Sequence, residues 1–355
     1  MTLTETPPTV EPEWLSSGRK SAPAVIRWAV ALLGAFAAFS VVIVLTGASP
    51  AEVFTDMWVS TFVRPRSLIE ILNTMAPIAL AALAVVVPAR AGMSNVGGEG
   101  QVIVGAIAAA GVALATDQFL PGEAVLGLMV LAGMAGGAAW AAIAGILRLA
   151  FQVNEAVSTL LLNFVALDLL LFLIYQPWRE SSSGQPTSRE LADVAKLPEI
   201  SGLGVGIGIV IAIIAAVAVY FVLRFTRWGF KLSVVGGNAE AARRAGLHVP
   251  ILILSALLVG GALAGLAGMI QFAGIEYKLR PGFALQIGYI GFLASWLARH
   301  RPLPVLFASF VFAALAVAGD SLQLDAQLPA ATVSILTAFI LIAVLGFTQK
   351  KGAVL

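Results

Sequence analysis

The sequence predicts an all-α protein that crosses a membrane about ten times. Hydrophobic residues make up 59% of its 355 residues and charged residues only 11%, whereas about 25% of the residues of a typical soluble domain are charged. The core of a bilayer is roughly 30 Å thick and needs about 20 apolar residues per helix. Apolar stretches of that length recur along the whole chain. Nearly all of the protein is therefore expected to lie within a membrane.

The apolar stretches divide the chain into three parts. Residues 1–24 are rich in Pro, Thr and Glu and are expected to form a disordered cytoplasmic tail. Residues 25–348 form the predicted transmembrane domain, and residues 349–355 form a second short tail. The first apolar run is too long for the core of a signal peptide, so it is expected to remain as an anchor helix. The predicted spans cover residues 27–46, 68–88, 93–115, 123–147, 156–176, 203–224, 250–273, 283–298, 302–319 and 330–347.

The Lys and Arg residues predict which side of the membrane each connection faces. With the N-terminus in the cytoplasm, about fourteen of them fall in cytoplasmic segments and about seven fall outside, as the preference of short cytoplasmic loops for positive charge requires. Both termini are therefore predicted to be cytoplasmic, in the cytoplasmic membrane of a bacterium. Two connections are longer than a hairpin needs. Residues 177–202 are predicted to face outward, and residues 225–249 inward.

Several kinds of chemistry have no support in the sequence. The chain has no cysteine and only two histidines, His248 and His300, which lie far apart in basic surroundings, so no metal site is expected. The chain also lacks a GxxxxGK[ST] phosphate loop, a GxSxG elbow and an HExxH zinc helix. We therefore expect no catalytic residue, no bound cofactor and no nucleic-acid partner. Any use of ATP must be the work of another polypeptide.

A polar, glycine-rich segment precedes the apolar part of the third span. The sequence GMSNVGGEGQ, Gly92 to Gln101, places Asn95, Glu99 and Gln101 among glycines. A charged carboxylate near the middle of a bilayer costs about 2.5–3.5 kcal/mol on insertion scales, so it faces protein or a wet cavity. Glycines weaken the helix here, and broken helices at membrane depth occur where they line a cavity or pack against protein. Asn95, Glu99 and Gln101 are predicted to line a substrate path. The alternative is a solvated loop in which Glu99 pairs with Arg90.

A second polar cluster opens the fifth span. Asn154, Glu155, Thr159 and Asn163 lie in this segment, and the last three are four residues apart, which places them on one helical face. A polar stripe on a membrane helix faces inward, so these four residues are predicted to line the same path. Hydrogen bonding between helices is an equally good interpretation. Asp168 lies deeper in the same span and could pair with a neighbouring span.

The inner connection contains a short helix with well-defined ends. In RWGFKLSVVGGNAEAARRAGLHVP, from Arg227 to Pro250, Asn238 is a natural N-cap for a helix over residues 239–245, and Gly246 is placed to terminate it. A short helix with a small-residue face beside arginines has the form of a segment that docks into a groove on a partner. The alternative is a plain loop that carries cytoplasmic positive charge.

Two further patterns concern the packing of the spans. Glycines recur within the apolar runs, as in GGALAGLAG from Gly260 to Gly268, and such glycines let membrane helices approach closely. The tripeptides at residues 90–92 and 280–282, Arg-Ala-Gly and Arg-Pro-Gly, lie near a short or interrupted span in different halves of the chain. Their predicted positions on opposite faces hint at an inverted internal repeat.

Together, GMSNVGGEGQ, NEAVSTLLLNFVALDLL and GGNAEAARRAG closely resemble segments of ABC-transporter permeases of the branched-chain amino acid and ribose-type superfamily. The group to which the chain is most similar comprises the permeases of nucleoside and simple-sugar importers. The resemblance covers roughly residues 25 to 348. The segment here departs from the commoner pattern NIGAEGQ at Ser94, Val96 and Gly97-Gly98, and Asp168 is unusual.

The resemblance implies a type II-like importer permease that works in a homo- or heterodimer. It implies a cytoplasmic ABC ATPase, which uses the ATP, and an extracytoplasmic substrate-binding lipoprotein as partners. The residues that would face the ATPase are Gly236, Gly237, Asn238, Glu240, Ala241, Ala242 and Gly246. The expected substrate is a nucleoside, with a simple sugar such as ribose as the alternative. A proton-coupled transporter in which Glu99 or Asp168 carries the proton is a rival from another class.

Overall fold

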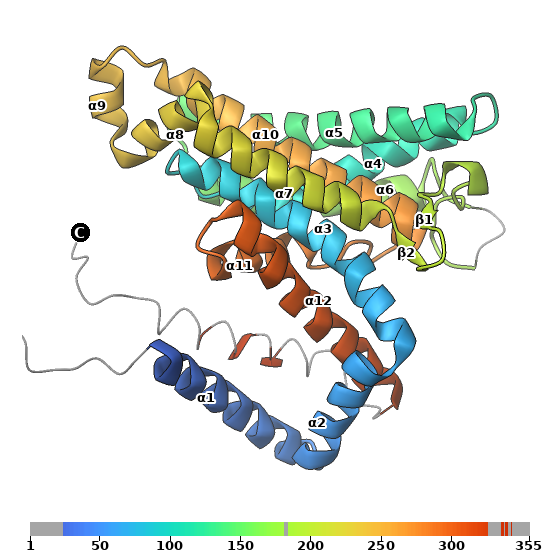
Figure 1. Ribbon diagram of the computed structural model, residues 1–355. Coiled ribbons are helices and arrows are strands. Elements are labelled where there is room, and N and C mark those ends of the chain that lie inside the picture. The colour runs from blue at the N-terminus through green and yellow to red at the C-terminus, as the bar shows by residue number, and fades with distance from the viewer. Residues whose placement is uncertain (1–23, 181–183, 326–334, 337, 340–341, 343–355) are drawn as a thin grey trace, which may run out of the picture.

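The computed structural model describes residues 24–180, 184–325, 335–336, 338–339 and 342 (Figure 1). Within this part of the chain the fold is almost entirely helical, with a single two-stranded antiparallel ribbon in which Glu199 pairs with Gly206 and Ile200 with Val205. The all-α prediction is therefore confirmed. The predicted tails, apart from Ala24, and most of the predicted last span lie outside the described residues.

The elements follow one another in the order shown in Figure 1. The first half contains α1 (Ala24–Leu45), α2 (Pro50–Trp58), the π-helix η2 (Val59–Val63), α3 (Pro65–Arg90), α4 (Gly98–Thr116), α5 (Gly122–Phe151) and α6 (Glu155–Tyr175). The second half contains η3 (Asp193–Ala195), β1 (Glu199–Ile200), β2 (Val205–Gly206), α7 (Gly208–Phe225), α8 (Arg227–Gly237), α9 (Ala239–Arg244), α10 (Val249–Gln271), the π-helix η4 (Phe272–Glu276), α11 (Ile287–Leu297) and α12 (Pro302–Asp325).

Seven of the described helices are long and apolar enough to cross a membrane: α3, α4, α5, α6, α7, α10 with η4, and α12. An eighth span is counted if α1 and the following α2 and η2, which meet at 117°, are taken as one broken crossing. These helices correspond to eight of the ten predicted spans, so the polytopic architecture is confirmed for the described residues. The number ten stays a prediction.

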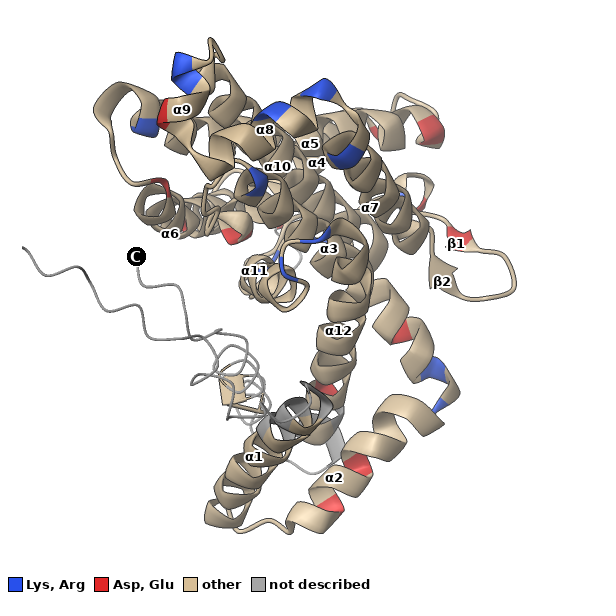
Figure 2. Ribbon diagram, turned by 60° about the vertical axis from the view of Figure 1, so that its left-hand side comes forward, with Lys and Arg blue, Asp and Glu red and all other residues tan. Residues whose placement is uncertain are grey.

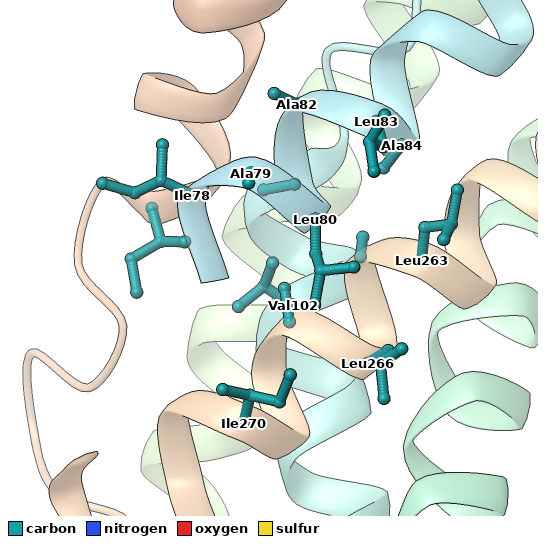
Figure 3. Packing of buried hydrophobic residues seen from close by; sticks show 14 of the residues in the cluster. Ile78, Ala79, Leu80, Ala82, Leu83, Ala84, Val102, Leu263, Leu266 and Ile270 are labelled. Atoms are coloured by element: carbon teal, nitrogen blue, oxygen red, sulfur yellow. The ribbon is translucent and has the colours of Figure 1, made fainter. Parts of the chain in front are cut away.

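The core of the bundle is formed by α3, α4 and α10. Figure 3 shows the branched side chains of this region, including Leu80 and Leu83 from α3, Val102 from α4, and Leu263 and Ile270 from α10. In a membrane, lipid tails are as apolar as these side chains, so the helices associate mainly through close packing. The long buried face of α3 therefore indicates that α3 lies at the centre of the protein.

Glycines bring α4, α5 and α10 into backbone contact. A Cβ atom on Gly265 of α10 would overlap the carbonyl oxygen of Gly133 on α5, and one on Gly268 would overlap the carbonyl oxygen of Val102 on α4. Even an alanine would push these helices apart. The glycine-rich runs serve close helix packing, as predicted, and we call this contact the glycine seam.

The predicted span over residues 283–298 is wrong in its extent, because only Ile287–Leu297 forms a helix, α11. The preceding residues run in irregular conformation, and four of them have left-handed backbone: Tyr277, Gly282, Ala284 and Gln286, with φ of 58°, 80°, 54° and 70°. Eleven helical residues rise only about 16 Å, roughly half of a bilayer core. We call residues 277–286, which lead into α11, the descending segment.

The two ends of the bundle differ in structure and in charge. Figure 2 shows Lys and Arg on α8 and α9 at one end and the acidic residue of β1 at the other. At the β1 end, Arg189 binds the buried Asp117 at the end of α4 at 2.7 Å, and Lys196 binds Asp193 at 2.8 Å. The hydrogen bond from Lys196 lowers the pKa of Asp193. The Arg189–Asp117 pair holds the long connection between α6 and α7 against the end of α4.

Candidate functional site

Six of the seven residues predicted to line a path come together in one buried, hydrogen-bonded group. It lies where the connection from α3 to α4 meets α6 and α11. We call it the polar cluster, and its members are Asn95, Glu99, Gln101, Glu155, Thr159 and Asn163.

Two amides fix the connection between α3 and α4. Asn95 donates to Gln101 Oε1 at 3.0 Å, and Gln101 donates back to Asn95 Oδ1 at 2.9 Å. Asn95 also donates to the carbonyl oxygen of Ala84 on α3 at 3.1 Å, and its Oδ1 accepts from the Gly97 N–H. Both side chains are almost fully buried. Because buried amides must be paired, this arrangement holds the start of α4 in one conformation.

The stripe on α6 binds the same connection. Thr159 Oγ1 accepts from the Val96 N–H at 3.3 Å, while Asn163 donates to the Val96 carbonyl oxygen at 3.0 Å and accepts from the Gly100 N–H at 2.8 Å. The predicted common face of residues 155, 159 and 163 is confirmed, because all three are buried against this connection. Asn163 also donates to the hydroxyl of Tyr289 on α11 at 3.2 Å.

Two carboxylates complete the polar cluster. Glu155 accepts from the Ser94 N–H at 3.2 Å and forms an ion pair with Arg148 at the end of α5. Glu99 accepts from the N–H groups of Gln286 and Gly288, each at 2.7 Å. The alternative of a solvated loop is wrong, because Glu99 is only 5% exposed and its bonds go to the start of α11 and not to Arg90.

Asn154 and Asp168 stand apart from the polar cluster. Asn154 is exposed, and its side chain caps α6 by accepting from the N–H groups of Ala156 and Val157 at 2.9 and 3.3 Å. Asp168 lies on the exposed side of α6. Within the described residues, no neighbouring span forms an ion pair with Asp168, the pairing that the sequence left open.

The predicted short helix of the inner connection is present as α9. Asn238 caps it by accepting from the Ala241 N–H at 2.9 Å, and Gly246 follows it with φ of +82°. Glu240 bridges Arg243 and Arg244 on its surface. The exposed members of the predicted ATPase-facing set are Gly236, Gly237, Asn238, Glu240, Ala241 and Gly246. Ala242 is the exception, because it is fully buried against the rest of the chain.

The connection between α7 and α10 also contains a helix that was not predicted from the sequence. α8 runs from Arg227 to Gly237, and Thr226 caps it by accepting from the Gly229 N–H at 3.1 Å. Its end packs directly on the α3–α4 connection, since a Cβ on Gly236 would overlap the carbonyl oxygen of Arg90 and one on Gly92 would lie 3.3 Å from Gly236 Cα. The exposed α9 is thus in backbone contact, through α8, with the connection that carries the polar cluster.

A cavity of about 600 Å³ lies on the other side of the polar cluster. Its wall is formed by α3, the end of α10 with η4, the descending segment, α11 and α12, together with Ala338. Its polar lining residues are Thr74, Gln271, Glu276, Arg280, Gln286, Tyr289 and Asp320. In the described part of the chain, no member of the polar cluster lines this cavity. Glu99 and Asn163 instead bind groups that do, the Gln286 N–H and the Tyr289 hydroxyl.

The descending segment is held by Glu276 as well as by Glu99. Glu276 accepts from Gln271 at 3.0 Å, from Arg280 at 2.9 Å and from the Ala284 N–H at 3.1 Å. The N–H groups of residues 284, 286 and 288 therefore all end on buried carboxylates. Such bonds stabilise left-handed backbone that non-glycine residues otherwise avoid.

Sequence reasoning found the polar cluster but not the cavity. The acidic residues of the cavity lie at helix ends, because Glu276 ends η4 and Asp320 lies near the end of α12. In a sequence, a charged residue at such a position is equally consistent with a helix end exposed to solvent. Gln271, an amide directly after a long apolar run, was the one available signal. The sequence pattern singled out Arg280 only as part of the repeated tripeptide at residues 280–282.

The chain is similar to a family of membrane permeases. Residues 67–345 match the family model described as branched-chain amino acid transport system / permease component. The chain is 35% identical over 338 residues to a glucose ABC transporter permease protein of Haloferax volcanii, with 91% of this chain and 88% of the relative covered.

Two further relatives are named for nucleosides. A guanosine ABC transporter permease protein of Bacillus subtilis is 29% identical over 339 residues, which cover 91% of this chain and 96% of the relative. A nucleoside ABC transporter permease protein of Lactococcus lactis is 28% identical over 324 residues, with 88% of each chain covered. The matches therefore extend over nearly the full length of these proteins.

Proposed function

This chain belongs to the family of permease components typified by branched-chain amino acid transport systems, and from that membership we propose that it carries nucleosides across the cytoplasmic membrane in an ATP-driven importer. Its relatives are permease subunits of ABC transporters. The ATPase is accordingly proposed to be a separate cytoplasmic subunit. A second permease, identical or related, and an external binding lipoprotein would complete the importer.

The observation that carries the proposal is the contact of α9, through α8, with the α3–α4 connection, which carries part of the polar cluster. α9 presents an exposed, capped surface at one end of the bundle, and the Gly236–Gly92 contact ties α8 to the α3–α4 connection. A push on α9 would therefore reach the start of α4 and, through Glu99, the start of α11. An ATPase subunit that closes when it binds ATP would exert this force on α9. In this mechanism the spans alternate between outward-open and inward-open states.

The proposed orientation places α8 and α9 in the cytoplasm. Arg90, Arg148 and Arg224 lie in the last turns of α3, α5 and α7, and Arg243 and Arg244 lie on α9 at the same end. This distribution supports a cytoplasmic location for that end. The connection between α6 and α7 would then meet the binding protein. Both chain termini are proposed to be cytoplasmic.

The choice of a nucleoside rests on chemistry and on two relatives. The cavity wall supplies amides, which both donate and accept hydrogen bonds, and carboxylates, which accept them from the hydroxyl groups of neutral compounds. The guanosine and nucleoside permeases match almost the whole chain. A simple sugar is the second candidate, because the glucose permease of Haloferax volcanii has the higher identity, 35%.

The test is ATP hydrolysis and uptake by the assembled importer. The chain would be co-expressed with the ATPase, permease and binding-protein genes that neighbour it and placed in nanodiscs and liposomes. We expect guanosine and uridine to stimulate hydrolysis and ribose, xylose and glucose to have little effect. Stimulation by sugars alone would keep the importer and replace the substrate. Uptake that a protonophore abolishes while ATP is held constant would favour the proton-coupled rival.

A further inference from the structure

The cavity beside α11 and α12 has no part in the contact between α9 and the polar cluster. We propose that it is the site where the permease holds its substrate in transit, and that Asp320 and Gln286 recognise adjacent hydroxyl groups of a neutral ring there. The proposal rests on the proposed function for the substrate class, since the ribose of a nucleoside and a free sugar both carry such hydroxyls.

The size and lining of the cavity fit a small polar molecule. Its volume of about 600 Å³ lies within the range of about 300–1,000 Å³ that is usual for small-molecule sites. Its lining combines apolar residues such as Ile78, Ile290 and Phe312 with a few polar side chains from separate elements. Convergent polar groups on a mainly apolar wall are the usual composition of a binding pocket.

Asp320 and Gln286 are two polar groups of the wall whose side chains the fold leaves available. Asp320 on α12 is exposed, and among the described residues neither a cation nor a hydrogen-bond donor binds its carboxylate. The Gln286 side chain is likewise exposed, although its backbone N–H is held by Glu99 at 2.7 Å. Glu276, in contrast, is already bound by Gln271, Arg280 and the Ala284 N–H. The polar cluster therefore fixes the backbone of Gln286, and the side chain remains free to bind.

The charges of the wall select against anionic ligands. Two acids, Glu276 and Asp320, stand against one basic residue, Arg280, which already pairs with Glu276. A carboxylate is a pure acceptor with two oxygens and can accept from two neighbouring hydroxyls, while the amide of Gln286 can both donate and accept. A ring with a vicinal diol satisfies this set of groups. A phosphorylated compound would be repelled by the free carboxylate.

The ring of Tyr289 provides a fixed face for the ligand. Tyr289 lines the cavity, and its hydroxyl is bound by Asn163 of the polar cluster at 3.2 Å. Anchoring the hydroxyl restricts the orientation of the ring, so a planar base or the apolar face of a sugar could lie against it. Through Asn163 and Glu99, the polar cluster positions two parts of the same wall.

The absence of cysteine from the chain allows a test that does not depend on transport. Ala316→Cys places one thiol on the α12 side of the cavity, and Val194→Cys places one on the exposed outer connection, away from the cavity. Both variants, in the complete importer without its binding protein, are treated with N-ethylmaleimide. The modified fraction of this chain is followed by intact-mass measurement. We expect uridine, at about four times its dissociation constant, to slow modification of Ala316→Cys about fivefold and to leave Val194→Cys unchanged.

Ligand and residue variants then test the recognition of hydroxyls. 2′,3′-Dideoxyuridine should protect Ala316→Cys at least about tenfold more weakly than uridine, because a site built to bind hydroxyls rejects a ligand that lacks them. Uridine monophosphate should also protect more weakly than uridine, because the free carboxylate of Asp320 repels its phosphate. Asp320→Asn and Gln286→Asn in the Ala316→Cys background should remove most of this preference. Glu70→Gln is the matched control: Glu70 is close enough to Asp320 for electrostatic interaction but does not line the cavity. Glu70→Gln in the Ala316→Cys background should keep the same preference for uridine over its analogues as Ala316→Cys alone.

The outcomes separate this proposal from the proposed function. An importer that transports uridine or glucose while neither protects Ala316→Cys would overturn the assignment of the cavity and leave the proposed function intact. Equal protection by uridine and its dideoxy analogue would overturn the recognition of hydroxyls. An importer that transports neither compound would contradict the proposed function, and protection of Ala316→Cys by either would still support the site.

Discussion

At the scale of single residues, Glu99 illustrates what the sequence could and could not predict. Its position among glycines predicted a carboxylate that faces protein or a wet cavity, and it is enclosed by protein. Its partners are backbone N–H groups 187 and 189 positions further along the chain, and no local pattern encodes a contact of that range. The sequence therefore predicted the burial of the residue but not its role as an anchor for the start of α11.

We expect Glu99→Gln to destabilise the protein and slow transport. The amide replaces one acceptor oxygen with an NH₂ group, so a donor would face the N–H of Gln286 or Gly288, at a cost of about 1–3 kcal/mol. Thermal unfolding in nanodiscs and initial uptake rates measure the effect. Glu123→Gln, on the exposed start of α5, is the control and should leave both unchanged. A fully stable and active Glu99→Gln protein would refute the anchoring role.

Asp168 makes a second prediction at this scale. A charge on the exposed middle of a span costs about 2.5–3.5 kcal/mol unless it faces water or protein, and within the described residues nothing in this chain pairs with it. In the assembled importer, Asp168→Cys should react with a charged, water-soluble thiol reagent. Phe221→Cys, on the exposed face of α7, should not. If Asp168→Cys reacts as little as Phe221→Cys, residue 168 faces lipid.

At the scale of elements, helix ends were more predictable than interrupted spans. The cap of α9 is local chemistry, because Asn238 and Gly246 lie next to the helix that they bound. α11 was predicted too long because residues 283–285 are as apolar as a helix, whereas Ala284 and Gln286 have left-handed backbone and their N–H groups are bound by Glu276 and Glu99. Hydropathy indicates whether a segment lies in an apolar environment. The backbone conformation of this segment depends on tertiary hydrogen bonds, which hydropathy does not report. α8 was missed because two glycines end it.

The contact between α8 and the α3–α4 connection provides a matched pair of glycine variants. Gly236→Ala should separate the two elements, because its Cβ would overlap the carbonyl oxygen of Arg90, whereas a Cβ on Gly237 meets nothing within 4 Å. We expect Gly236→Ala to uncouple ATP hydrolysis from uptake. Gly237 belongs to the predicted ATPase-facing set, so Gly237→Ala can change the rate of hydrolysis, but it should keep the ratio of substrate moved to ATP hydrolysed because it leaves the contact of α8 unchanged. The test is the ratio of substrate moved to ATP hydrolysed, measured in liposomes for both variants. An unchanged ratio in Gly236→Ala would argue against this contact as the route of coupling.

At the scale of the whole molecule, the chain divides into a tight block and an outlying arm. α3, α4, α5 and α10 pack closely, while α1 and α2 lie apart from them in Figure 1 and contact α12 through a small separate cluster that includes Phe39, Met57 and Leu322. The fold class and most of the spans followed from hydropathy alone. Which helices form the block did not, because the glycines that decide it are spread over the whole sequence.

The glycine seam predicts that replacing the single hydrogen atom of a glycine side chain with a methyl group will disturb folding. Gly265→Ala would place a methyl group against the carbonyl oxygen of Gly133, and overpacking of this kind costs about 1–3 kcal/mol or more. We expect a lower unfolding temperature and a lower yield of folded protein. Gly127→Ala on α5, whose Cβ meets nothing within 4 Å, should match the parent. A normal unfolding temperature for Gly265→Ala would show that these helices can move apart freely.

The glycine seam also sets a condition on how the protein is made. Roughly 100 residues separate the end of α5 from the start of α10, and translation at about 5–20 residues per second needs about 5–20 s to cover them. Until α10 leaves the ribosome, the paired α4 and α5 must wait in the membrane with their glycine faces uncovered, and the descending segment that Glu99 anchors has not yet been synthesised. The nascent chain therefore has to pass through a half-built state in which its later core is open to lipid, to the insertion machinery and to proteases.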